Sequence, residues 1–296
     1  MSICARGVSA RPCSARANAR HYLTIATHKG KHFQVVLLQN GGHVVGAYNV
    51  VLYHYLDGKQ QVRFYKRAVH TGYKRSDSFL EHEKEERTEY EIKRSIEQSM
   101  NRTKKTIYEI ARCNRWQVFV TFTLNPVLID RTDYSVIVPT LHEWVRKMKR
   151  DFAPDLKYIL VPELHRDGIS YHFHGLLANM GEMPLLDSEH IDRKGRTIYN
   201  LPTYIYGWST ATIVSDNSAV CSYIAKYITK ELASVTVGKK RYWVSKNVDR
   251  PKKSYFYMSD DDVSNTIDSL TENIVYSKTL DVKHISQTIR YLELED

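Results

Sequence analysis

Two strand-like stretches separated by Asp167-Gly168 constrain the fold of this chain more than any other feature. The first stretch reads LKYILVPE, residues 156–163, and the second reads ISYHFHGLL, residues 169–177. An Asp-Gly pair between such stretches favours a two-residue type I′ turn, which predicts an antiparallel β-hairpin. In the register that this turn sets, Glu163 lies directly opposite His172.

The predicted hairpin brings two histidines and one carboxylate together. His172 and His174 point to the same face because side chains alternate along a strand. Glu163 would share that face, since opposed Cβ atoms in a sheet are about 4.5–5.5 Å apart. Two imidazoles and a carboxylate suit one Mn²⁺, Mg²⁺ or Zn²⁺ ion and leave room for a substrate oxygen. We therefore predict a metal site, with a pair of satisfied, half-buried histidines as the alternative interpretation.

A second cluster lies in YIAKYITK, residues 223–230. On a helix its four tyrosines and lysines would share one face, because residues three or four apart are neighbours; they are Tyr223, Lys226, Tyr227 and Lys230. A tyrosine has an ordinary pKa of about 10, so an ammonium one turn away would favour the nucleophilic phenolate. Attack on a metal-polarised phosphate would form a phosphotyrosine linkage. An ordinary amphipathic helix with two tyrosines at its edge is the alternative.

The charge of the chain indicates a polyanionic partner. The 43 Lys and Arg residues exceed the 33 Asp and Glu residues, which gives a net charge of +10 at pH 7. Such a balance favours nucleic acid first and an anionic membrane second. The sequence shows no apolar run near the roughly 18 residues of a membrane span, and no secretory signal is expected. The cysteines form no C-x-x-C pair, which fits a reducing cytoplasm.

The remaining patterns predict an α+β chain in four segments. Residues 1–80 would form a basic leader and a β-rich region with a hairpin at Asp57-Gly58, and residues 81–115 a long or broken helix that acts as a connector. In residues 116–235 we expect strands at 116–126, 156–163, 169–177 and 209–216, and helices at 140–152 and 217–232. This order is typical of an antiparallel sheet with helices on one side. Residues 236–296 read as a basic and aromatic segment followed by an acidic tail with one or two helices.

Taken together, the two clusters resemble the HUH endonuclease superfamily, and most closely the rolling-circle replication initiators (Rep proteins) of phages and plasmids. FVTFTL, residues 119–124, looks like the first family motif. HFH, residues 172–174, looks like the His-hydrophobic-His metal motif, with Glu163 in the place of the extra acidic ligand. YIAKYITK is similar to the nucleophile motif, including the two-tyrosine arrangement of some phage initiators. The resemblance covers roughly residues 115–235.

The resemblance implies both a fold and a reaction. The fold would be a central antiparallel sheet of about five strands, ferredoxin- or RRM-like, with flanking helices. The reaction would be nicking of one DNA strand at an origin with Mn²⁺ or Mg²⁺, leaving a 5′-phosphotyrosine and a free 3′-hydroxyl, followed later by rejoining. The partner would be single-stranded origin DNA. Because the sequence has no G-x-x-x-x-G-K-[ST] phosphate loop, a host helicase and polymerase would be needed, in the cytoplasm of a bacterial host.

The nucleophile stays open between two tyrosines. Tyr223-x-x-Lys226 and Tyr227-x-x-Lys230 are equivalent as patterns. In two-tyrosine initiators both can act alternately, whereas single-tyrosine relatives keep one. We favour Tyr227 because both lysines could flank it.

Five further residues are candidate DNA contacts. Thr121 and Thr123 are expected to shape the sheet edge or to touch the DNA strand. Trp208 could stack on a base, although a core tryptophan is the more frequent outcome. Lys240 and Arg241 could contact backbone phosphates, with a solvated loop as the equal alternative.

Other functions compete with the initiator. A relaxase shares the chemistry, but its tyrosine precedes the histidine motif, whereas here it follows. A single-strand DNA transposase of the HUH type is the closest rival enzyme. A non-catalytic nucleic-acid-binding protein on an RRM-like sheet would show glycine- and aromatic-rich strand motifs, which are not evident. A zinc hydrolase of small molecules would leave the basic charge and the tyrosine helix unexplained.

Overall fold

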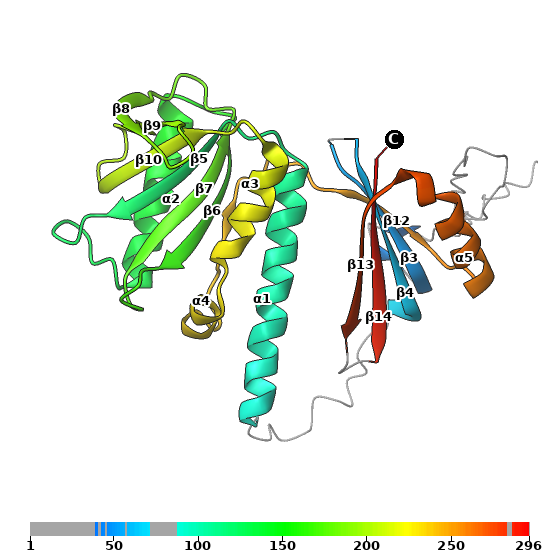
Figure 1. Ribbon diagram of the computed structural model, residues 1–296. Helices are drawn as coiled ribbons and strands as arrows, with labels where there is room; N and C mark the ends of the chain where they lie inside the picture. Colours follow the sequence, from blue (N-terminus) through cyan, green and yellow to red (C-terminus); the bar gives the residue numbers. More distant parts are fainter. Residues whose placement is uncertain are drawn as a thin grey trace, which may run out of the picture. The chain divides into compact units, whose positions relative to one another are not determined.

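The computed structural model describes residues 39–40, 43–44, 46–56, 58–71, 88–282 and 286–295. Contacts within this part of the chain define two compact units (Figure 1). The smaller unit combines strands that precede residue 72 with strands and a helix between residues 253 and 294. The larger unit consists mainly of residues 88–252 and contains every candidate site residue. Within the described residues, no helix is both long and apolar enough to cross a membrane.

The larger unit is built on an antiparallel sheet of seven described strands in the order β11-β6-β7-β5-β10-β9-β8. Their bounds are Val118–Leu124 (β5), Lys157–Leu164 (β6), Tyr171–Ala178 (β7), Leu186–Ile191 (β8), Thr197–Asn200 (β9), Gly207–Ile213 (β10) and Trp243–Val244 (β11). The predicted α+β class is confirmed. The sheet is wider than the expected five strands because residues 186–200 form an additional hairpin and β11 extends the edge beside β6.

The hairpin of β6 and β7 has the predicted register but a different turn. Glu163 pairs with His172, as expected. The type I′ turn is wrong, because only Gly168, with φ of 74°, has a positive φ there. The N–H of His165 donates to the carbonyl of Ser170, so four residues form the connection. The register is preserved because the two-residue and four-residue connections are both centred on Asp167-Gly168.

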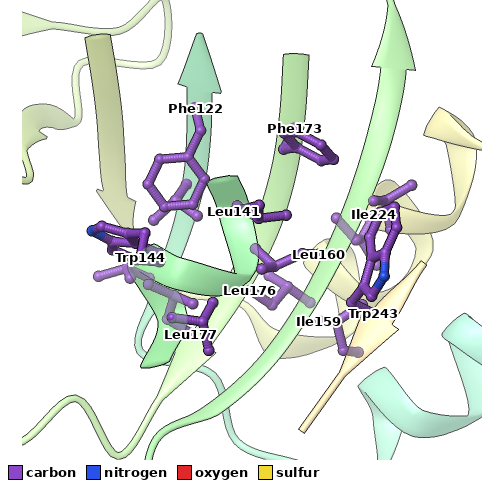
Figure 2. Packing of buried hydrophobic residues seen from close by; sticks show 14 of the residues in the cluster. Phe122, Leu141, Trp144, Ile159, Leu160, Phe173, Leu176, Leu177, Ile224 and Trp243 are labelled. Atoms are coloured by element: carbon purple, nitrogen blue, oxygen red, sulfur yellow. The ribbon is translucent and has the colours of Figure 1, made fainter. Parts of the chain in front are cut away.

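Helices cover both faces of this sheet, so the expectation of helices on one side is wrong. Along β5 every second residue is fully buried. On one face Phe122 packs against Trp144 of α2 (Tyr134–Asp151), with ring centroids 4.6 Å apart. Figure 2 shows these two side chains in the core with Leu141. On the other face Phe119 contacts Tyr223 of α3 (Asn217–Ile224).

The predicted helix over residues 217–232 is not continuous. It divides into α3, a 3₁₀ turn η2 (Ala225–Tyr227) and a second helix α4 (Lys230–Val235). Ile228 leaves the helical conformation, with ψ of 85°, and Thr229 caps α4 by accepting the N–H of Leu232. A threonine hydroxyl is a favoured helix cap, which explains why the chain restarts a helix here.

A long helix precedes the sheet, as the sequence predicts for the connector. α1 (Glu89–Arg112) begins with a capping box, in which Thr88 and Glu91 each bond the backbone N–H of the other. Ile107, Ile110 and Ala111 near its end are buried, and α1 packs against α3 and α4. The predicted helical residues before 88 lie outside the described residues.

The smaller unit is a five-stranded sheet in the order β12-β3-β4-β14-β13. Its strands are β3 (Gly46–His54), β4 (Gln60–Thr71), β12 (Lys252–Phe256), β13 (Ile274–Val282) and β14 (Gln287–Leu294); α5 (Asp260–Ser269) and η3 (Thr271–Asn273) belong to it, and β1 (Gln39–Asn40) pairs with β2 (His43–Val44) separately. β3 and β4 are neighbours, as predicted, although Asp57 of their turn lies outside the described residues, as does the predicted leader. The acidic tail contains the expected helix and two strands that the sequence analysis did not predict.

Candidate metal centre and tyrosine pair

Glu163, His172 and His174 form a possible metal-binding triad on one face of the seven-stranded sheet. The Oε2 atom of Glu163 lies 2.5 Å from Nε2 of His172 and 2.6 Å from Nε2 of His174, and the two Nε2 atoms are 3.0 Å apart. Metal–ligand distances of about 2.0–2.2 Å place neighbouring ligand atoms about 3 Å apart. Two nitrogens and one oxygen that converge in this way fit a divalent ion.

The other ring nitrogen of each histidine also has a polar partner. Nδ1 of His174 lies 3.1 Å from Oγ1 of Thr121, and Nδ1 of His172 lies 3.1 Å from Nε2 of His165. Metal-binding histidines almost always have such a partner, which fixes the ring orientation and the tautomer. Thr121 can therefore orient His174, and His165 can orient His172. Sequence reasoning missed His165, although its place at the start of the hairpin turn, near the facing ligand, could have indicated it.

The charges of the triad are coupled. Burial raises the pKa of the Glu163 carboxyl, but the hydrogen bonds with His172 and His174 outweigh it and lower that pKa to about 2. Burial lowers the pKa of His174, and the hydrogen bond with Glu163 only partly opposes this effect. An ionised carboxylate beside a histidine that favours the neutral form is the protonation state that binds a metal ion.

The two tyrosines of the second cluster lie next to the triad. The ring of Tyr227 stacks on the imidazole of His174, with centroids 3.6 Å apart and planes 13° apart. Tyr223 contacts Tyr227 edge-on at 5.3 Å, and both phenols pack on Phe119 of β5. Tyr223 is 47% exposed, whereas Tyr227 is half-buried. The first-motif strand, the histidine strand and the tyrosine segment thus meet at one place.

The lysines do not take the predicted positions around Tyr227. Lys226 Nζ lies 5.8 Å from the ring centroid of Tyr223, and Lys230 starts α4 beyond the break in the helix. Burial raises the pKa of Tyr227, and the neighbouring Tyr223 and the Glu163 carboxylate raise it further. The expected flanking of Tyr227 by two ammonium groups is therefore wrong, because the helical face that would provide it ends at Ile228.

A cross-strand row connects the triad to two of the candidate DNA contacts. Trp208 pairs with Thr123, Thr123 pairs with His172, and His172 pairs with Glu163, so the four side chains share one face of the sheet. Trp208 is 59% exposed, which excludes the core position. β5 lies between β7 and β10, so the threonines occupy an interior strand and not an edge.

Lys240 and Arg241 differ despite being adjacent. Arg241 is buried, and its guanidinium donates to Thr236 Oγ1, to Ser99 Oγ and to the carbonyl of Ala233. These bonds tie the end of α4 to α1, so the prediction of a phosphate contact fails for Arg241. Lys240 is exposed, and its backbone carbonyl accepts the phenol hydrogen of Tyr134, on the sheet face that α2 covers.

The segment that carries this geometry was compared with known protein families. Residues 117–232 match the family of the replication-associated protein ORF2. The matched segment holds the triad, Thr121 and both tyrosines, and covers less than half of the chain. Searches of curated proteins and of solved structures give no match. The family match supports a replication-associated protein of the Rep initiator type, which acts in DNA replication and binds DNA.

Proposed function

We propose that this chain is a rolling-circle replication initiator of the HUH type that nicks one DNA strand at an origin. The observation that carries the proposal is the contact between the tyrosine segment and the triad, in which Tyr227 stacks on His174 at 3.6 Å. A nucleophile next to a metal centre, in a chain with a net charge of +10, suits attack on a DNA phosphate. The match to a replication-associated family supports an origin as the substrate.

The proposed reaction exchanges one phosphodiester for another. The phenolic oxygen attacks phosphorus, the bond from phosphorus to the 3′ oxygen breaks, and the net result moves the phenol proton to that oxygen. The products are a 5′-phosphate joined to tyrosine and a free 3′-hydroxyl. A Mn²⁺ or Mg²⁺ ion bound by the triad would supply positive charge to the phosphate oxygens. Reversal of the same exchange rejoins the strand without ATP.

We assign the first attack to Tyr227 because its ring contacts a triad histidine, whereas Tyr223 reaches the triad only through Tyr227 and Phe119. Tyr223 then serves in a second exchange, when the replicated strand is cut and rejoined. Lys226 stays near Tyr223 and can favour its phenolate.

The proposed domain roles follow the same segments. Residues 116–235 act as the endonuclease domain, and residues 81–115 act as a helical connector. The partners are single-stranded origin DNA together with a host helicase and polymerase in a bacterial cell.

A nicking assay tests this function. The protein is incubated with Mn²⁺ and single-stranded DNA from its own replicon, labelled at the 3′ end in one sample and at the 5′ end in another. We expect the 3′ label to join the protein covalently and the 5′-labelled fragment to end in a hydroxyl that a polymerase extends. Both products should disappear in His174→Ala. Bound but uncut DNA would contradict the proposal and favour a non-catalytic nucleic-acid-binding protein.

A further inference from the structure

A cleft of about 480 Å³ opens beside the tyrosine pair. Its floor is the threonine-rich face of β5 and β10, and Tyr223 and Phe119 form an aromatic wall. The residues that line it and matter here are Phe119, Thr121, Thr210, Thr212, Asp216 and Tyr223. The turn between β8 and β9 contributes Asp192, Lys194 and Arg196 to the opposite side. A volume of this size lies within the range of small-ligand sites.

The charges of the cleft oppose a bound phosphate. Asp192 already engages Arg196 through its side chain, at 2.8 Å from Nε, so this cation is balanced within the turn. Asp216 accepts the backbone N–H of Ala219 and adds a second carboxylate to the lining. Two carboxylates against Lys194 and Arg196 leave the site close to neutral. A neutral ligand with polar edges suits this lining better than an anion.

The walls of the cleft match the two surfaces of a nucleobase. Aromatic side chains stack on the flat face of a base without sequence preference. Threonine hydroxyls and a carboxylate can donate to or accept from the hydrogen-bonding edge of an unpaired base. Thr121 contributes to the cleft and also contacts His174, so a base in the cleft lies one residue from the metal triad.

We propose that this cleft holds the base of one unpaired nucleotide next to the phosphate that is cut. The inference rests on the proposed nicking function, which places single-stranded DNA at the triad. The base would be anchored between Tyr223 and the threonine floor, and its own phosphates would lie outside, toward the triad. Anchoring one base in this way would fix the position of the scissile phosphate relative to Tyr227.

Binding measurements with a chelator present separate this inference from catalysis, because no strand is cut. The probes are a fluorescent oligodeoxycytidine and a strand of equal length and charge that lacks bases. Ala219→Trp places a large ring in the cleft from an exposed position of α3, and Ser218→Trp adds the same ring to the adjacent exposed position, outside the cleft lining. Thr210→Tyr obstructs the cleft from β10 and replaces Ala219→Trp if that variant does not fold.

We expect the obstructed variant to bind the oligodeoxycytidine about tenfold more weakly than wild type, while Ser218→Trp stays within about twofold. Binding of the base-free strand should not differ among the three proteins. Equal affinities of wild type and the obstructed variant for the oligodeoxycytidine would overturn the inference. Nicking is scored separately: its absence in wild type removes the proposed function, while the binding comparison still decides whether the cleft takes a base.

Discussion

Tyr227 and His174 lie face to face, with ring centroids 3.6 Å apart. The contact joins a strand residue that can bind a metal ion to a tyrosine more than fifty positions later in the chain. It covers the imidazole and leaves its Nε2 atom directed at Glu163. Because stacking uses the ring and nucleophilic attack uses the hydroxyl, the two roles of Tyr227 can be separated by mutation.

Tyr227→Phe keeps the ring and removes the hydroxyl. We expect its melting temperature and its affinity for Mn²⁺ to match wild type, because the stack on His174 remains. The covalent adduct should fall on the order of 10³-fold or more, since removal of a nucleophile has effects of this size. Tyr223→Phe is the matched control and should retain the first cut. Loss of the first cut in Tyr223→Phe alone would reverse the assignment.

Thr121→Val removes the hydroxyl that contacts Nδ1 of His174 while keeping the shape of the side chain. We expect metal affinity to fall by about 10- to 100-fold, the usual cost of losing such an outer partner. Thr121→Ser should restore most of it, because the hydroxyl returns. Thr210→Val, on the neighbouring strand opposite Thr121, serves as control. Calorimetric titration with Mn²⁺ measures all four proteins; unchanged affinity in Thr121→Val would argue against an orienting role.

Gly175→Ala tests the packing directly behind the histidine strand. A Cβ at residue 175 would lie 2.5 Å from Cδ2 of Leu160 and 3.0 Å from Cγ2 of Val120. Both neighbours are fully buried, so the sheet cannot yield easily. We expect a loss of about 1–3 kcal/mol in the free energy of unfolding.

Leu160→Ala provides the partner for a double-mutant cycle with Gly175→Ala. The shortened side chain removes the closest atom, so the two losses should be less than additive. Denaturant titration measures the four free energies. Strict additivity would show that the contact with Leu160 is not the cause of the destabilisation.

Asp167 makes the stability of the hairpin turn depend on pH. The hydrogen bonds from Ser170 and Ile169 lower its pKa from 3.8 to about 2. Because the folded-state pKa is depressed, the stabilisation is present above pH 3.8 and is lost as the pH falls toward 2. Asp167→Ala should therefore melt below wild type at neutral pH and converge with it near pH 2. Arg166→Ala is the control in the same turn, and its difference from wild type should not change across this range.

Trp208→Ala tests whether the exposed face of the cross-strand row contacts DNA. We expect affinity for single-stranded DNA to fall by about 1–3 kcal/mol, the cost of losing one base stack. Trp208→Phe should retain most of the affinity because an aromatic face remains. Both variants should keep the thermal stability of wild type to within about 0.5 kcal/mol, since Trp208 is 59% exposed. Fluorescence anisotropy with an oligonucleotide makes the comparison, and equal binding by Trp208→Ala would exclude the contact.

The pairing of Glu163 with His172 was predictable from sequence because alternation along strands and a centred turn are local rules. The α+β class followed from the same rules. The break at Ile228 was not predictable, because the apolar periodicity continues through it and only the cap by Thr229 ends the helix face. His165 and Thr121 were missed as orienting residues because their role depends on cross-strand neighbours. Burial of Arg241 depends on α1, which lies more than one hundred positions away in the chain.

The smaller unit takes strands from both sides of the larger one in the chain. β4 is bordered by β3 and β14, which are separated by more than two hundred residues of sequence. During synthesis β3 and β4 leave the ribosome long before β14 exists, so one edge of β4 stays unpaired meanwhile. The residues that carry the triad and the tyrosines are made within this interval. We therefore expect the chemistry-bearing unit to be folded before the five-stranded sheet can close.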